Sequence, residues 1–450
     1  MKNKKAFGLA LAFACSSLLV PMGIAQAGEE PAEVAEDFEP TEGAPLGTMA
    51  VDVSLREMGL YKKVQQYEAM GDGKVMLRQT WPELYLADGD GRSMLKSKSF
   101  PRLAAALEAY TNSMCQEAYR VQGELREDAL RDYQERKESG YGDSFMGYSW
   151  ETDLLVKRAD TLVLSFVEKN WTYLGGAHGQ QTFKGVNFDT STGERLSLHQ
   201  VFPDPEMLVD AIIAHLRVEN KPGTFNDNME SVVADGVIHD KISWTLGPRG
   251  ATFYFNPYDI AAYAAGMITV TISFDEHRDL FEPKYKLGPA SYCEEIPSYE
   301  LTDVVLQDDG SGMRTALGVY PDSDKLTISL GSKKYEEHFF GGGDIHSVFV
   351  HTGAGNNYLY VDYGYASPQM GTGRQMEVFA LDGGTPVFRG TFPYSFQRTI
   401  DLTNTGEHWI GQWIMTDPYE FNIDEINISA NGQSKTHTVQ IGSEGVPTFG

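Results

Sequence analysis

The residues of this chain best suited to chemistry lie in one glycine-rich stretch around a single histidine. Gly175, Gly176 and Gly179 surround His178 in the run GGAHG, directly after the aromatic segment NWTYL. An imidazole can transfer protons or bind a metal ion, and glycines permit positive φ angles and close backbone approach. Three uses are therefore open: catalysis, metal binding, and a shaped loop that binds a partner.

The surrounding sequence favours the third use. No second histidine lies near His178 in sequence, and the segment QQTFKGVNF that follows reads as a strand, whereas phosphate binding needs a helix start. There is no G-x-S-x-G elbow, and neither Cys115 nor Cys293 has a signature context. We therefore assign no catalytic residue, no metal ligand and no cofactor. We predict that the GGAHG run fixes a loop to which the ring of His178 is hydrogen-bonded.

A second aromatic stretch, FYFNPYDIAAYAAG, adds a candidate binding surface. Asn256 and Pro257 set a turn, with Tyr254, Tyr258 and Tyr263 nearby. These rings either pack the sheet or form a platform that stacks on sugar rings. The full set of predicted contact residues is Gly175, Gly176, His178, Gly179, Asn187, Asp189, Asn256, Pro257, Tyr258 and Tyr263.

Alternating and helical patterns predict two structural classes along the chain. Residues 51–285 read as an α+β region, an antiparallel sheet with covering helices, and residues 290–450 as an all-β domain of the sandwich type. A long amphipathic helix or helix pair is expected at 100–140, and a further amphipathic helix at 204–220. Strands are expected at 74–86, as a pair within 161–176, as a pair within 187–202, and as three strands within 242–276. Residues 88–91, DGDG, read as a plain turn rather than a calcium loop.

The N-terminus reads as a secretory signal. Three lysines precede a small apolar run that ends in Ala-Gln-Ala, so cleavage is expected after Ala27, with lipid attachment at Cys15 as a disfavoured alternative. Residues 28–50 form an acidic leader, followed by an accessory region at 51–150 and a further domain at 151–285. The expected location is periplasmic or secreted, with no transmembrane segment in the mature chain.

The charge balance limits the class of partner. The chain has 37 basic and 63 acidic residues, and removing residues 1–27 would remove three lysines and no acids. Such a surface repels phosphate backbones, so nucleic acid is excluded as a partner, whereas a basic protein is attracted at long range. Two cysteines would remain, Cys115 and Cys293, and an oxidising compartment permits a disulfide between them.

Two sequence blocks resemble a known bacterial family. The segments FVEKNWTYLGGAHGQQTFKGVNFDTSTGERLSLHQVF and ISWTLGPRGATFYFNPYDIAAYAAGMITVTISFDE are similar to the RsiV-like extracytoplasmic domain, which also occurs as an accessory region in PdaC-type peptidoglycan deacetylases. The resemblance covers about residues 150–283. Residues 51–150 look, more weakly, like the domain that usually precedes it.

The resemblance implies binding rather than catalysis. In the RsiV branch the domain senses lysozyme by binding it, behind a transmembrane helix that this sequence lacks. In the deacetylase branch, catalysis uses a T-F-D-D-G motif and an H-x-x-x-H motif. Here Asp308-Asp309-Gly310 lacks the Thr-Phe, and His346 and His351 are five residues apart. We therefore expect a binding protein that recognises a lysozyme-like basic protein or peptidoglycan. The alternative is a cell-wall hydrolase or deacetylase whose carboxylates or histidines the sequence does not reveal.

Overall fold

The structure is a computed structural model. It describes residues 50–52, 59–87, 100–287, 292–308, 311–322, 325–338, 343–353, 356–367, 371–394, 409–415, 420–427, 434–442 and 445–449. The expected signal segment, nearly all of the acidic leader and the 88–91 turn lie outside these residues.

A six-stranded sheet forms the N-terminal half, with its strands in chain order. Neighbouring strands are antiparallel except β3 and β4, which pair in parallel. A parallel pair needs a long crossover, and helix α1 supplies it. The predicted α+β class is confirmed, with this one parallel pair in addition. The strands are β1 Ala50–Asp52, β2 Gly59–Gly71, β3 Lys74–Ala87, β4 Tyr148–Ala159, β5 Val163–Tyr173 and β6 Gln180–Asp189.

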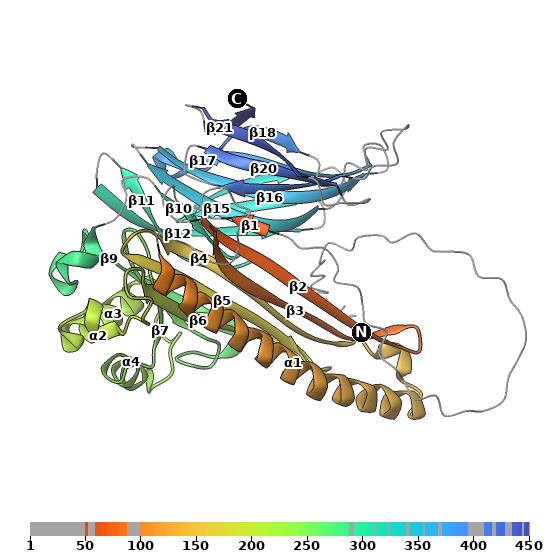
Figure 1. Ribbon diagram of the computed structural model, residues 1–450. Helices are drawn as coiled ribbons and strands as arrows, with labels where there is room; N and C mark the ends of the chain where they lie inside the picture. The colour runs from red at the N-terminus through yellow and green to blue at the C-terminus, as the bar shows by residue number, and fades with distance from the viewer. Residues whose placement is uncertain are drawn as a thin grey trace, which may run out of the picture.

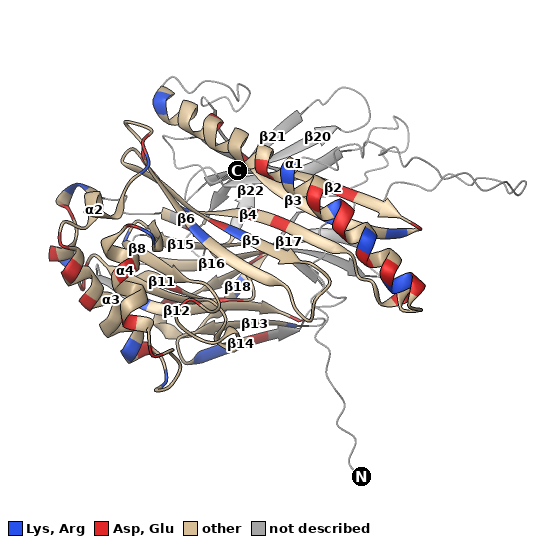
Figure 2. Cartoon of the chain, turned by 90° about the horizontal axis from the view of Figure 1, so that it is seen from below, with Lys and Arg blue, Asp and Glu red and all other residues tan. Residues whose placement is uncertain are grey.

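The predicted long helix is α1, Pro101–Glu138. Proline suits the first helical turn, and Gly140 with φ +80° ends the helix in the left-handed region. Leu103, Leu107, Thr111 and Met114 recur at spacings of three or four on the buried face. The opposite face carries charges of both signs (Figure 2), so α1 covers the long strands of the sheet and presents a polar surface outward (Figure 1).

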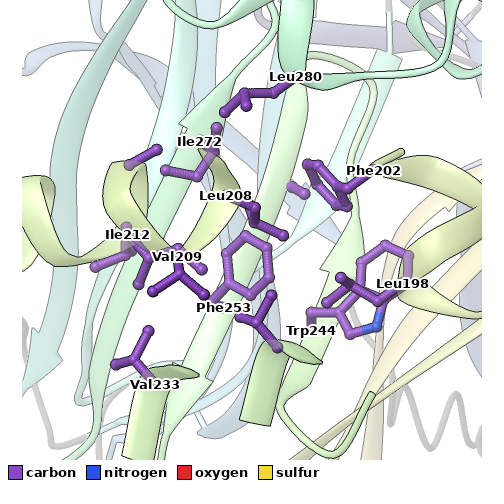
Figure 3. Packing of buried hydrophobic residues seen from close by; sticks show 14 of the residues in the cluster. Leu198, Phe202, Leu208, Val209, Ile212, Val233, Trp244, Phe253, Ile272 and Leu280 are labelled. Atoms are coloured by element: carbon purple, nitrogen blue, oxygen red, sulfur yellow. The ribbon is translucent and has the colours of Figure 1, made fainter. Parts of the chain in front are cut away.

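A smaller sheet, β7-β8-β9, packs under three helices and builds the core shown in Figure 3. The Asp204 carboxylate accepts from Met207 N–H at 3.0 Å and so caps the predicted helix α3. Phe202, Leu208 and Phe253 are fully buried there. The bounds are β7 Ser243–Leu246, β8 Gly250–Phe255, β9 Ile268–Ser273, α2 Leu198–Val201, α3 Pro205–Glu219 and α4 Met229–Ile238.

Two local predictions in this region were wrong. Residues 161–176 contain one long strand, β5, instead of two. The turn lies before Val163, because the Asp160 carboxylate accepts from Leu162 and Val163 N–H. The expected strand pair within 187–202 is instead the end of β6, a turn and helix α2. Leu198 and Val201, three apart, bury one face of that short helix.

The all-β class of the C-terminal region is confirmed. Its strands follow one another in antiparallel meanders, and β10 joins the outer edge of β15. The bounds are β10 Tyr292–Glu295, β11 Leu301–Asp308, β12 Ser311–Pro321, β13 Lys325–Leu330, β14 Lys333–His338, β15 Gly343–Gly353, β16 Asn356–Ser367, β17 Gly371–Ala380, β18 Val387–Tyr394, β19 Trp409–Met415, β20 Glu420–Asn427, β21 Ser434–Ile441 and β22 Pro447–Phe449. Asp308, the last residue of β11, pairs with Ser311, the first residue of β12.

The sheet of β15–β17 is buried on both faces. Leu359 and Val361 face the sheet β11–β14, which gives the face-to-face packing of a sandwich. Tyr358 and Tyr360 alternate with them and join a core with α1 and β3–β6. The C-terminal region therefore packs directly on the N-terminal sheet. Within the described residues, no helix combines the length and apolar character that crossing a membrane requires.

Candidate functional site

The two predicted loops meet at the ends of β5 and β8. The Tyr263 hydroxyl donates to the carbonyl of Gly179 at 2.7 Å. The Asn256 side chain accepts from Phe183 N–H at 2.6 Å and donates to Phe183 C=O at 3.3 Å. This amide therefore pairs with the edge of β6 as a strand backbone would, and it holds the second loop against the first.

His178, Tyr258 and Tyr263 form a surface that we call the aromatic cluster. The rings of His178 and Tyr263 stack with centroids 4.1 Å apart and planes 27° apart, and Tyr258 lies 5.5 Å from Tyr263. The Tyr258 side chain is 63% exposed, and His178 is exposed as well. These rings therefore present aromatic surface to solvent, in addition to the tyrosines that pack the core.

The ring of His178 is held as the sequence predicted. Its Nδ1 lies 2.9 Å from the carbonyl of Gly179, which can only accept a hydrogen bond, so Nδ1 carries the proton. The same carbonyl accepts from Tyr263. Both rings are thus oriented by one backbone oxygen of the glycine-rich loop.

Two of the glycines are required by their surroundings. A Cβ on Gly179 would lie 2.1 Å from the Trp171 ring, so only glycine lets the loop rest on that indole. Gly175 has φ +75°, and its carbonyl accepts from Arg136 of α1 at 2.9 Å. The neighbouring Asp132 accepts from the same guanidinium at 2.9 Å and raises the pKa of Arg136. Gly176 makes no comparably close approach.

A pocket of about 370 Å³ is lined in part by the turn that carries Tyr258. Asn256 and Asp259, which flank Tyr258 and Pro257 in the turn, line it together with Ser231, Asp235 and Lys241. These side chains offer both hydrogen-bond donors and acceptors. The sequence did not predict that α4 and Lys241 help to line this pocket. Nothing in their local pattern indicates that they contact the turn at Asn256.

Asn187 and Asp189 do not join this surface. Asn187 is buried, donates to Trp244 C=O at 2.9 Å and accepts from Ser165 Oγ at 2.6 Å, so it links β5 and β6 to β7. Asp189 accepts from Ser191 and Thr192 N–H and pairs with Lys284 at 2.7 Å. The "NFDTSTG" segment is therefore a structural turn, and its two predicted contact residues serve the fold.

Asp189 makes the turn sensitive to acid. Burial alone would raise the pKa of this carboxyl, but hydrogen bonds from Lys284, Ser191 and Thr192 outweigh it and lower the pKa to about 2. Because the folded pKa lies below the unfolded value of 3.8, the stabilisation is complete above about pH 4 and disappears as the pH falls toward about 2.

We expect Asp189→Asn to lower the free energy of unfolding by about 2 kcal/mol near neutral pH, because each tenfold change in the proton affinity of a group corresponds to about 1.4 kcal/mol. Urea unfolding of both proteins at about pH 6 and about pH 2.5 measures this difference. The difference should be much smaller at about pH 2.5 than at about pH 6. A gap of equal size at both pH values would contradict the assignment.

The structure leaves the cysteine pair untested. The Cys115 Sγ lies 3.6 Å from Glu83 Oε1. Cys293 lies in β10 opposite His351, and its side chain is outside the described residues. A disulfide between them stays a prediction.

Metal-binding geometry occurs at another place. Among the residues that the structure describes, His215, Glu276 and His277 form a group whose ligand atoms all lie within 4.8 Å of one another. His178 does not belong to it. The two histidines are 62 positions apart, so a search for neighbouring histidines in the sequence could not find the pair.

Comparison with known proteins matches one region of the chain to a family model. The family model described as "Protein of unknown function (DUF3298)" matches residues 206–275, which span α3 to β9. A DUF3298 family member from Bacteroides fragilis is 17% identical with a TM-score of 0.35, over 52% of this chain and 96% of its own. A DUF3298 family protein from Pseudomonas aeruginosa is 16% identical with a TM-score of 0.32, over 55% of this chain and 99% of its own. No curated protein matches this chain.

Proposed function

We propose that this chain is a non-catalytic binding protein of the cell envelope and that its aromatic cluster holds the glycan of peptidoglycan. The observation that carries the proposal is the stacked pair of His178 and Tyr263 with the exposed ring of Tyr258 beside it. Exposed aromatic faces bury the apolar faces of sugar rings, and polar groups around them orient the ligand. The proposed setting is the periplasm or the cell exterior, reached with the predicted signal segment.

The backbone of Tyr258 supports a binding role. This residue has φ +77°, a conformation that non-glycine residues seldom adopt and that costs free energy. The turn that enforces it is held by Asn256 N–H, which donates to Asp259 at 2.7 Å, and by the Asn256 side chain on β6. The fold thus stabilises an unfavourable backbone that leaves a tyrosine ring in solvent.

The neighbouring pocket supplies the polar half of such a site. Lys241 pairs with Asp235 at 3.2 Å, and Asp259 lies on the turn beside Tyr258. The hydroxyl and acetamido groups of a glycan both donate and accept hydrogen bonds. The side chains that line the pocket supply donors and acceptors, and part of them lies on the turn that carries Tyr258. We propose that one sugar stacks on the rings while its substituents reach the pocket.

A lysozyme-like basic protein is the second candidate partner, and the observation that favours it is charge. The chain carries a formal net charge of −26. Attraction of this kind weakens as salt screens it, whereas ring stacking on a neutral sugar depends little on salt. Salt dependence therefore separates the two partners.

We expect a Tyr258→Ala, Tyr263→Ala double variant to bind purified peptidoglycan at least about tenfold more weakly than the wild type, because truncated interface aromatics cost upward of about 1.4 kcal/mol. Sedimentation with insoluble peptidoglycan and calorimetry with soluble glycan fragments measure the loss. Tyr141→Ala, which removes an exposed tyrosine beyond the end of α1, is the matched control and should bind normally.

Equal binding of the double variant and the wild type would overturn the glycan proposal. Salt-sensitive retention of lysozyme, unaffected by the double variant, would support the second candidate instead. Release of reducing sugar or acetate from the glycan would contradict the non-catalytic role.

A further inference from the structure

A polar cluster joins α3, the segment after β9 and the first C-terminal sheet. His215 and Glu219 come from α3, Glu276 and His277 follow β9, and Arg314 lies on β12. His215 Nε2 lies 2.9 Å from His277 Nε2, with the ring planes 77° apart. Two imidazoles therefore direct their ε nitrogens at one point.

The other ring nitrogen of His215, Nδ1, lies close to one hydrogen-bond donor and one acceptor. Arg314, which can only donate, lies 2.9 Å from His215 Nδ1, and Glu219, which can only accept when ionised, lies 3.0 Å from it. Arg314 also pairs directly with Glu219. When the Nδ1 proton is donated to Glu219, Nε2 keeps a free lone pair, which is the carboxylate–histidine arrangement found behind metal-bound imidazoles.

The charge of the cluster also suits a cation. Glu219, Glu276 and Asp303 surround the guanidinium of Arg314, so three carboxylates face one fixed positive charge. Burial and the nearby Glu219 raise the pKa of Asp303 to about 6. The formal charges of these three carboxylates and one guanidinium sum to −2, which one divalent ion would balance.

We propose that His215, His277 and Glu276 bind a divalent transition-metal ion, with Zn²⁺ as the ion that their chemistry fits best. Two imidazoles and one carboxylate form a three-ligand set that leaves a fourth tetrahedral position for water or another small ligand. Zinc–nitrogen bonds of about 2.0–2.1 Å put two ligand nitrogens about 3.3 Å apart, so the histidines need to separate by only a few tenths of an ångström. Glu276 can ligate with one oxygen and pair with Arg314 through the other.

Such an ion would tie the region matched by the DUF3298 model to its surroundings. His215 lies inside residues 206–275, and Glu276 and His277 follow directly after. Through Glu219 and Arg314 the ion would also be linked to β12 in the C-terminal region. This inference is independent of the glycan proposal, because it uses different residues and a different ligand.

The test is a Zn²⁺ titration of the purified, untagged protein after chelator treatment. We expect one tight Zn²⁺ per chain by calorimetry, and a loss of at least about 100-fold in affinity in His215→Ala and in His277→Ala. Glu219→Gln, which removes only the acceptor behind His215, should weaken binding about tenfold or more. His239→Ala is the matched control, because His239 pairs with Asp235 at 2.9 Å on α4 in the same i,i+4 way and belongs to no such histidine pair among the described residues.

A second measurement keeps the proposal testable if a histidine variant does not fold. Co²⁺ added to the wild-type protein should give visible absorption of tetrahedral character that Zn²⁺ displaces. Zn²⁺ should also raise the melting temperature of the wild type but not of folded His277→Ala. Wild-type protein without stoichiometric Zn²⁺ binding, or a His277→Ala variant that binds as the wild type does, would overturn it. The histidine pair would then be an ordinary hydrogen bond.

Discussion

Replacing Arg158 with methionine is expected to lower the free energy of unfolding by about 3–5 kcal/mol, the usual effect of breaking a buried ion pair. The Arg158 side chain is 0% exposed and pairs with Asp160 at 2.6 Å. It also donates to the carbonyls of Tyr285 and Leu287 at 2.9 Å and 2.6 Å. Methionine would fill the space but leave these acceptors without their donor.

Urea unfolding followed by tryptophan fluorescence measures this change. Arg131→Met is the matched control, because Arg131 pairs with Asp128 on the exposed face of α1, where ion pairs contribute at most about 1 kcal/mol. Arg158→Lys should recover only part of the loss, since one ammonium group cannot replace a fork that reaches several acceptors. A cost for Arg158→Met below that of the control would refute the structural role assigned to this side chain.

Replacing Lys157 with alanine is expected to cost a similar amount, about 3–5 kcal/mol, for a different reason. The Lys157 side chain is 4% exposed, donates to Glu295 C=O at 2.6 Å and lies 3.7 Å from a Glu294 carboxylate oxygen. Burial lowers the pKa of Lys157 and raises the pKa of Glu294, while each opposes the shift of the other. Removing the ammonium leaves the buried Glu294 carboxylate of β10 without the cation of this pair.

The double variant Lys157→Met, Glu294→Gln isolates this penalty. Because it removes both charges, it should recover at least half of the stability that Lys157→Ala loses. In Lys157→Ala the pKa of Glu294 in the folded protein should rise further above its ordinary value of 4.5. The unfolded chain then loses this proton more readily than the folded protein, so the free energy of unfolding should fall as the pH rises above 4.5. Lys184→Ala, which removes an exposed lysine of β6 paired with Glu168, is the control and should change little. Equal losses in the single and double variants would show that the pair itself is not responsible.

Helix α1 and helix α3 show what local pattern can predict. Their apolar residues recur at helical spacing, and Pro101, Asp204 and Gly140 mark their ends. These signals depend on residues a few positions apart, so they can be recognised in the sequence without knowing how the rest of the chain folds. The same holds for the turn at Asn256.

The candidate site was predicted in part for the same reason. The loops at His178 and Tyr263 carry local glycine, proline and aromatic signals, and the structure brings them together. Asn187 and Asp189 sit in an equally distinctive motif but are used inside the fold. A motif marks a residue as constrained, and only its neighbours in space show whether the constraint is structural or functional.

Sequence alone therefore determined the class of each region, α+β and then all-β, because helix and strand periodicity are short-range properties. The tertiary structure decided which distant groups meet. A bulge in β4 between Val156 and Arg158 lets two neighbouring cations both be buried, and Gly185 lies where a Cβ would come within 1.8 Å of the Trp244 carbonyl. His215 meets His277 only because α3 packs on the sheet β7–β9 and His277 follows the last strand of that sheet. Such pairings depend on how the elements are packed, and packing joins residues whose separation along the chain carries no periodic signal.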